Sequence, residues 1–243
     1  MTYVRDQSLQ EDSPSAIFLS EYILEINEGS DFLNALSGET QKILRKHCTR
    51  SSFEKGHSIF YQGDQHSGVW IIEAGRARTF YTGPSGREIT LAYWTQGHFI
   101  GGPEVFGRGR HVWSADALED CEMLFLSGTN LRKLVREVPD IAVAVIHGLI
   151  AKGKCYSALI QMLGTRSISE RLRQFLLILA DAEGRREGSK IVIDRTITYE
   201  QIASIVGATR QWVTQSFDKF RSEGLLEINR SEIIIHRISA LQT

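Results

Sequence analysis

A short run near the C-terminus carries side chains that could read the edges of DNA bases. Over residues 209–220 the apolar residues repeat at helical spacing, and the polar residues fall on the opposite side of that helix. In a major groove, an arginine guanidinium prefers guanine and a glutamine amide prefers adenine. The polar face consists of Thr209, Arg210, Gln211, Thr214, Gln215 and Lys219. An ordinary solvated helix face would have the same spacing, so the neighbouring elements must decide between the two interpretations.

Those neighbouring elements have the layout of a helix-turn-helix. Residues 198–201 (TYEQ) match a capping box that starts a first helix, and Gly207 predicts the end of that helix. Thr209 then caps the second helix. A predicted hairpin that pairs 225–228 with 232–236 follows and supplies a wing. The wing favours DNA binding over a plain solvated face.

The residue types that usually hold metals or catalyse reactions show no such arrangement. The seven histidines form no HxH, HxxxH or HExxH pair, and no N-terminal cysteine cluster could hold iron and sulfur. The three cysteines are Cys48, Cys121 and Cys155. Their odd number and wide spacing indicate a reducing compartment with no disulfide framework. We expect no metal, no cofactor and no enzymatic activity, with a redox role of Cys48 or Cys155 as an open alternative.

Composition is that of a soluble globular protein. The chain has 243 residues and a formal net charge of −1. Residues 165–243 hold 12 basic and 10 acidic residues, a net of +2, which permits nucleic-acid binding without arguing for it. The longest uninterrupted apolar run, 141–146, is far shorter than the roughly 20 residues that span a bilayer. With no apolar segment of a signal peptide at the N-terminus, we expect a cytoplasmic protein and no membrane contact.

The central part of the chain has the pattern of a β-roll or barrel. Between residues 56 and 109 lie 11 of the 21 glycines, and short β-type runs separate them. The predicted strands are 58–61, 69–73, 77–81, 88–94 and 121–126. Short strands with glycine turns every 8–12 residues indicate a sandwich or barrel.

A long helix is predicted to follow this β region. Pro139 suits the first turn of a helix that continues uninterrupted to about Leu163, a length of roughly 37 Å. Apolar residues on one side of it are spaced by three and four, so that side must be buried, most simply against a second copy of the chain. The predicted dimer interface consists of Ile141, Val145, Gly148, Cys155, Leu159 and Met162.

Together these features resemble the cyclic-AMP receptor protein and fumarate-nitrate regulator family of bacterial transcription factors. The segments that carry the resemblance are 197–226 (ITYEQIASIVGATRQWVTQSFDKFRSEGLL), 56–78 and 97–106 (GHFIGGPEVF). The resemblance implies an α+β fold and a homodimer that binds operator DNA, RNA polymerase and a small-molecule effector. The implied parts are an N-terminal extension (1–30), an effector-sensing β-roll of the cyclic-nucleotide-binding type (31–138), a dimerisation helix (139–164) and a winged helix-turn-helix (165–243).

Two sets of residues depart from the family pattern. The family commonly reads DNA with Arg, Glu and a later Arg, and the matching positions here are Arg210, Gln211 and Gln215. In members that bind cyclic AMP, Gly-Glu and Arg-Ser hold the ribose and the phosphate, whereas the matching pairs here are Gly101-Gly102 and His111-Val112. The resemblance therefore implies a pocket for another effector, anionic or flat and aromatic. Its predicted residues are Gly101, Gly102, Glu104, Phe106, Arg108, Arg110, His111, Tyr156 and Ser157.

Two other functional classes remain as alternatives. A glycine-rich β-roll is also the scaffold of cupin metal enzymes, but these need an HxH pair followed by Glu, and residues 165–243 would then have no role. A cyclic-nucleotide regulatory subunit of a larger signalling protein is the second alternative, and the altered phosphate contacts argue against it.

Overall fold

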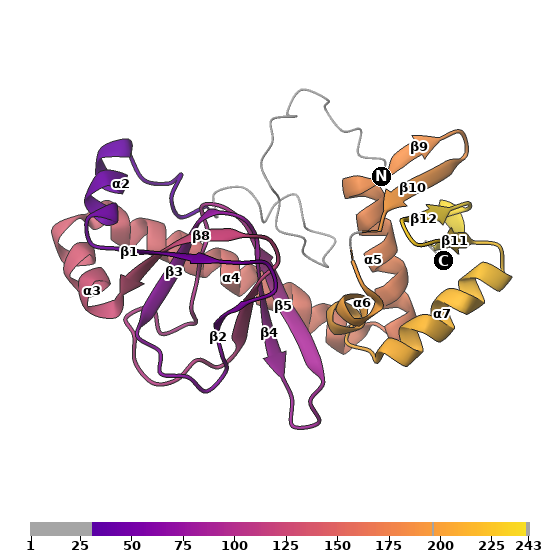
Figure 1. The fold of residues 1–243 in the computed structure, drawn as a ribbon, viewed down its shortest axis with the longest axis horizontal. Coiled ribbons are helices and arrows are strands. Elements are labelled where there is room, and N and C mark those ends of the chain that lie inside the picture. The colour runs from indigo at the N-terminus through magenta and orange to yellow at the C-terminus, as the bar shows by residue number, and fades with distance from the viewer. Residues whose placement is uncertain (1–30, 196, 242–243) are drawn as a thin grey trace.

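A computed structural model describes residues 31–195 and 197–241, so the predicted extension over residues 1–30 lies outside the described residues. The fold is α+β: a β-roll, one long helix and a C-terminal helical unit with a small sheet. Figure 1 shows the long helix running along the β-roll and ending beside the C-terminal unit.

The β-roll consists of two antiparallel four-stranded sheets, with orders β1-β8-β3-β6 and β2-β7-β4-β5. Their bounds are β1 Thr49–Phe53, β2 Ser58–Phe60, β3 Gly68–Ala74, β4 Ala77–Thr82, β5 Glu88–Trp94, β6 Phe99–Ile100, β7 Ser114–Ala117 and β8 Cys121–Ser127. The five predicted strands are confirmed, while β1, β6 and β7 were not predicted. These three are polar, very short or built from small residues, so they lack the β-branched and aromatic pattern that marks a strand.

Helices flank the roll. They are α2 Gly38–Arg45, α3 Gly128–Glu137 and α4 Pro139–Thr165. Ser37 and Ser127 cap the first two with their side chains, and Pro139 occupies the first turn of α4 as predicted. Among the described residues, α4 is the one helix whose length and hydropathy would suit a membrane span. The uninterrupted apolar run 141–146 did not predict this hydropathy. The other apolar residues of α4 are separated by polar ones along the sequence, although they line two sides of the helix.

The inner side of α4 corrects the predicted dimer interface. Ile141, Val145, Cys155 and Met162 are buried within the single chain, and Leu159 is half-buried. A Cβ added at Gly148 would lie 2.4 Å from the Phe99 ring, so this glycine lets the helix approach the roll closely. The first part of the predicted stripe, Ile141, Val145, Gly148 and Cys155, therefore packs on the chain's own β-roll.

The outer side of α4 presents a second apolar stripe to solvent. It consists of Val143, Ile146, Ile150, Gly153, Ser157 and Ile160, which we call the outer stripe, and all six are exposed. Their spacing is three, four, three, four and three, which is the heptad pattern of a coiled coil. Exposed apolar residues in such a pattern indicate a helix–helix interface.

The C-terminal unit surrounds a helix-turn-helix with a small sheet of order β11-β12-β10-β9. Its elements are α5 Ile168–Glu183, β9 Arg185–Glu187, β10 Lys190–Asp194, α6 Tyr199–Val206, α7 Arg210–Ser222, β11 Leu226–Ile228, β12 Glu232–Ile235 and the 3₁₀ helix Ile238–Leu241. The predicted hairpin is confirmed as β11 and β12. Ile197 lies in a bend before α6, and Thr196 is outside the described residues.

Candidate DNA-binding face and effector pocket

Local sequence fixes both ends of α6. Thr198 Oγ1 accepts a hydrogen bond from the Gln201 backbone N at 3.2 Å, and the Thr198 backbone N donates to Gln201 Oε1 at 2.8 Å. This is the predicted capping box. Gly207 follows the helix with φ +65°, the left-handed conformation that glycine adopts without strain. The turn then leads directly into α7.

One face of α7 is anchored in the core and the other is free. Thr209 Oγ1 accepts from the Trp212 backbone N at 3.2 Å and begins the helix. Val213, Phe217 and Phe220 are buried in the C-terminal core. Trp212 is half-buried against the same core, so it is a packing residue rather than a free aromatic surface.

The side chains predicted to contact DNA are gathered on the free face. Arg210, Gln211, Gln215 and Lys219 are exposed, and Thr214 is half-buried with its hydroxyl donating to the Arg210 carbonyl at 3.1 Å. Lys219 forms only a surface ion pair with Glu223, at 3.9 Å, which is weak in water. Figure 1 shows α7 on the outside of the C-terminal unit. This face offers a guanidinium, two amides and an ammonium to a groove.

In the β-roll, Gly101 and Gly102 form a buried turn that a larger residue would strain, with φ of +152° and +138°. The buried His111 ring lies against this turn, and its Nδ1 is 2.7 Å from the Gly101 carbonyl oxygen. The ring also stacks on Phe60, with centroids 4.0 Å apart. Burial lowers the pKa of His111, so its imidazole is neutral near pH 7 and offers no fixed charge to a phosphate.

His66 is a pocket residue that sequence reasoning missed. Its ring is 1% exposed, lies 4.3 Å from the His111 ring and neighbours the Gly102 backbone. Neither ring nitrogen forms a well-aligned hydrogen bond among the described residues, although the Gly101 backbone lies close by, and burial lowers the pKa of this imidazole as well. No local motif marks His66, because Gly102 and His111, the residues that its ring contacts, are more than 30 residues away.

The other residues predicted for this pocket are spread more widely. Glu104 and Arg108 are exposed, and Arg110 donates to the Gly63 carbonyl at 2.6 Å. Phe106 lies under the Arg132 guanidinium at 4.9 Å, away from His111 and toward α3. The structure therefore brings Gly101, Gly102 and His111 of the predicted set together with His66 and Phe60, and Glu104 lies near enough for its charge to act on His66.

The two predicted residues on α4 separate as well. The Tyr156 ring packs edge-on against Trp113 at 5.6 Å, and burial raises the pKa of its hydroxyl. Ser157, the next residue, is exposed and belongs to the outer stripe. Tyr156 therefore packs against the core of the β-roll, while Ser157 faces solvent.

Lys152 is a buried amine on the inner side of α4. Its Nζ donates to the Phe99 carbonyl at 2.6 Å and lies 3.6 Å from the centroid of the Trp94 ring. Burial lowers its pKa to about 7. Among the described residues, no three His, Cys, Asp or Glu side chains gather in a way that could hold a metal ion. Lys152 ties the long helix to the strand that leads into the Gly101–Gly102 turn.

Comparison with known proteins matches each of these two sites to a family model. Residues 50–138 match the cyclic nucleotide-binding domain, and residues 170–243 match the Crp-like helix-turn-helix domain. The Global nitrogen regulator of Nostoc is 25% identical over 188 residues, which are 76% of this chain and 84% of the relative. The CRP-like cAMP-activated global transcriptional regulator of Mycobacterium tuberculosis is 24% identical over 192 residues, 79% of this chain and 86% of the relative.

A solved structure shares the fold. The c-di-GMP responsive global regulator CLP of Xanthomonas campestris superposes with a TM-score of 0.74 at 18% identity, covering 83% of this chain and 100% of that one. The likeness therefore extends over the β-roll, the long helix and the C-terminal unit together.

Proposed function

Because the chain belongs to the CRP/FNR family of transcription regulators, which bind DNA through the helix-turn-helix, we propose that it acts as a homodimer. We propose that its DNA binding is controlled by a small-molecule effector other than cyclic AMP. We further propose the division into extension, sensor, dimerisation helix and DNA-binding part at 1–30, 31–138, 139–164 and 165–243. The cytoplasm is the proposed compartment, and RNA polymerase is a proposed partner.

The observation that carries the effector proposal is the His111 stack. A cyclic phosphate needs charged donors, and His111 stands where the family resemblance expects the arginine. Here the neutral ring is held between Phe60 and the Gly101 carbonyl. No carboxylate follows Gly101, because position 102 is glycine. The relative from M. tuberculosis is named as cAMP-activated and CLP as c-di-GMP responsive, so ligand preference differs among similar chains.

Support for a dimer comes from the outer stripe. Val143, Ile146, Ile150 and Ile160 are each at least half exposed, and an unpartnered apolar stripe of this length is unfavourable in water. If two copies packed together through their outer stripes, the two α7 helices of the dimer would be related by a two-fold axis. A two-fold pair suits half-sites separated by about one DNA turn.

Two measurements test the proposal. Selection of bound sequences from a random DNA library should enrich a palindrome with two half-sites, and Arg210→Ala in the same selection should lose that enrichment. Titration calorimetry with cyclic AMP should show no heat at concentrations of roughly 100 μM, because losing two charged contacts costs about 2–5 kcal/mol each. The cAMP-activated relative from M. tuberculosis serves as the positive control. Micromolar binding of cyclic AMP to this chain would overturn the effector proposal.

A further inference from the structure

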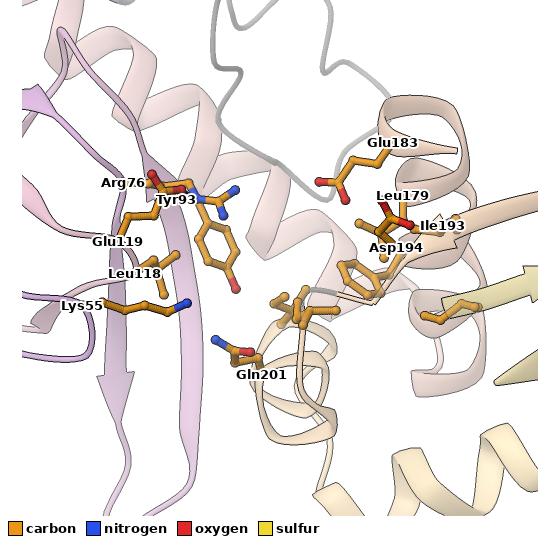
Figure 2. A pocket seen from close by; sticks show the side chains of 14 residues that line it. Lys55, Arg76, Tyr93, Leu118, Glu119, Leu179, Glu183, Ile193, Asp194 and Gln201 are labelled. Atoms are coloured by element: carbon orange, nitrogen blue, oxygen red, sulfur yellow. Dashed lines mark ion pairs between the residues drawn. The ribbon is translucent and has the colours of Figure 1, made fainter. Parts of the chain in front are cut away.

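A cavity of about 260 Å³ lies between the β-roll and the C-terminal unit, and none of the residues that line it belongs to the His111 pocket. Figure 2 shows side chains of the roll on one side of this cavity and side chains of α5, α6 and β10 on the other. Phe175, Leu179 and Ile193 give the C-terminal wall an apolar surface. The cavity is small, below the roughly 300–1,000 Å³ of pockets for drug-sized ligands.

Three hydrogen-bond donors line this cavity. The Tyr93 side chain is 7% exposed, and its hydroxyl lies close to the Thr90 side chain without forming a well-aligned hydrogen bond among the described residues. Gln201 uses its amide oxygen in the capping box with Thr198, which leaves its NH₂ group to donate elsewhere. Figure 2 shows the Tyr93 hydroxyl and the Gln201 amide directed into the gap.

Lys55 is the third donor and carries a charge. It lies in the turn between β1 and β2, where its backbone N donates to Asp120 Oδ1 at 2.9 Å and fixes the turn. Its ammonium group forms no hydrogen bond or ion pair in the part of the chain that the structure describes, and Figure 2 shows it reaching into the cavity toward Gln201. A free ammonium beside two uncharged donors favours an anion.

The acidic residues around the cavity do not neutralise Lys55. Glu119 pairs with Arg76 at 3.2 Å, and Asp194 pairs with Arg185 at 2.8 Å. Glu183 lies across the cavity on the C-terminal side. The Glu119 carboxylate, which lines the cavity on the same side as Lys55 and Tyr93, is thus engaged by Arg76.

We propose that this cavity is a second ligand site, which binds a small organic carboxylate through Lys55, Tyr93 and Gln201 while the apolar part of the ligand packs on Phe175, Leu179 and Ile193. The carboxylate oxygens accept hydrogen bonds from these three donors, and charge-assisted hydrogen bonds of this kind are the stronger class. Burial raises the pKa of Tyr93 to about 12, so its hydroxyl remains a donor at neutral pH.

Such a ligand would act on the arrangement of the two parts of the molecule. Lys55 and Tyr93 belong to the roll, whereas Gln201 belongs to α6 of the helix-turn-helix. A ligand that contacts both binds only when the two parts lie together, so it shifts the population toward that arrangement. The consequence for DNA binding rests on the proposed function, whereas ligand binding in the cavity does not.

Calorimetric titration of the full chain with sodium octanoate tests the site, with octan-1-ol and octylamine as matched neutral and cationic probes. Octanoate should bind at one site per chain, and the two other probes should bind at least about tenfold more weakly, because a hydrogen bond to a charged group contributes about 1.5–3 kcal/mol. Lys55→Ala should weaken octanoate binding by about tenfold or more, and Lys55→Arg should restore most of it. Tyr93→Phe should weaken it severalfold, whereas Glu183→Gln should strengthen it by removing a repulsive charge.

Absence of octanoate binding at about 5 mM, or equal binding by wild type and Lys55→Ala, would overturn the site. Lys55 is exposed and carries no side-chain contact, so its variants are not expected to unfold the protein. The same titration can be repeated while DNA affinity is measured by anisotropy on the selected operator. A protein that binds octanoate but no DNA would contradict the proposed function and leave the site intact.

Discussion

Thr90 Oγ1 on β5 and Ser204 Oγ on α6 lie 2.8 Å apart, and both residues are buried between the β-roll and the helix-turn-helix. Arg87, from the same hairpin as Thr90, donates to the Gly207 carbonyl in the turn between α6 and α7. Tyr93, further along β5, packs in the hydrophobic core of the C-terminal unit. The β4–β5 hairpin is therefore the physical connection between the sensor and the element that carries the DNA-binding face.

Removing both hydroxyls of the Thr90–Ser204 pair should cost less than the sum of the two single removals. Thr90→Val or Ser204→Ala alone leaves a buried hydroxyl without a partner, which costs about 1–3 kcal/mol. In the double variant no unpaired hydroxyl remains, so its free energy of unfolding should lie closer to wild type than the sum of the single changes. Urea unfolding of the four proteins measures this, and strictly additive changes would show that the two hydroxyls are not coupled.

Arg210→Ala should weaken binding to the selected operator by about 1–3 kcal/mol and relax the preference at one base position in each half-site. The guanidinium is exposed at the N-terminal end of α7, where such a helix enters the groove. Lys219→Ala should instead weaken all sequences alike, because an ammonium near a phosphate carries no base preference. Anisotropy on the operator and on its single-base variants distinguishes the two, and wild-type specificity in Arg210→Ala would contradict the role of this face.

Ile150→Asp should convert the protein to monomers. Ile150 is 50% exposed in the centre of the outer stripe, and in a dimer the new carboxylate would be buried without a counterion, at a cost of several kcal/mol. His147→Asp is the matched control, because His147 is also exposed but lies outside the outer stripe. Sedimentation at micromolar concentration should show monomers for the first variant and dimers for the control. A monomeric wild type would refute the interface.

Lys152 should make the protein more stable as the pH rises from 7 to 10. Burial lowers the pKa of this ammonium from 10.5 to about 7, so between these values the unfolded chain binds more protons than the folded chain. The free energy of unfolding then rises with pH, by at most about 1.4 kcal/mol per unit from this group. Its neighbours Cys155 and His98 stay neutral there, since burial raises the thiol pKa to about 12 and lowers the imidazole pKa.

Substitution separates Lys152 from the other titrating groups. Lys152→Met should be more stable than wild type near pH 7.5 and should show a flatter dependence on pH, because the desolvated ammonium is gone. Lys154→Met, two residues further along α4 and exposed, should leave both quantities unchanged. Thermal or urea unfolding as a function of pH measures both quantities. If Lys152→Met kept the pH dependence of the wild type, the rise of stability with pH would belong to other residues.

The sequence by itself determined the elements whose signals are local. The capping box at Thr198 and Gln201, the left-handed Gly207 and the Thr209 cap each depend on residues within three or four positions, so the helix-turn-helix could be predicted with its ends. The long helix from Pro139 and strand β5 were predicted for the same reason, because periodicity within one segment is independent of distant contacts.

The tertiary structure alone decided which faces meet and which distant residues share a site. Helix α4 is apolar on two sides, and only the approach of Phe99 to Gly148 selects the inner side, which leaves Ile150 and its neighbours outward. His66 and His111 are brought together across a turn of the β-roll, and Lys55 meets Gln201 across two parts of the molecule. Periodicity shows that a side chain lies on a face, but the partner of that face depends on how the whole chain packs.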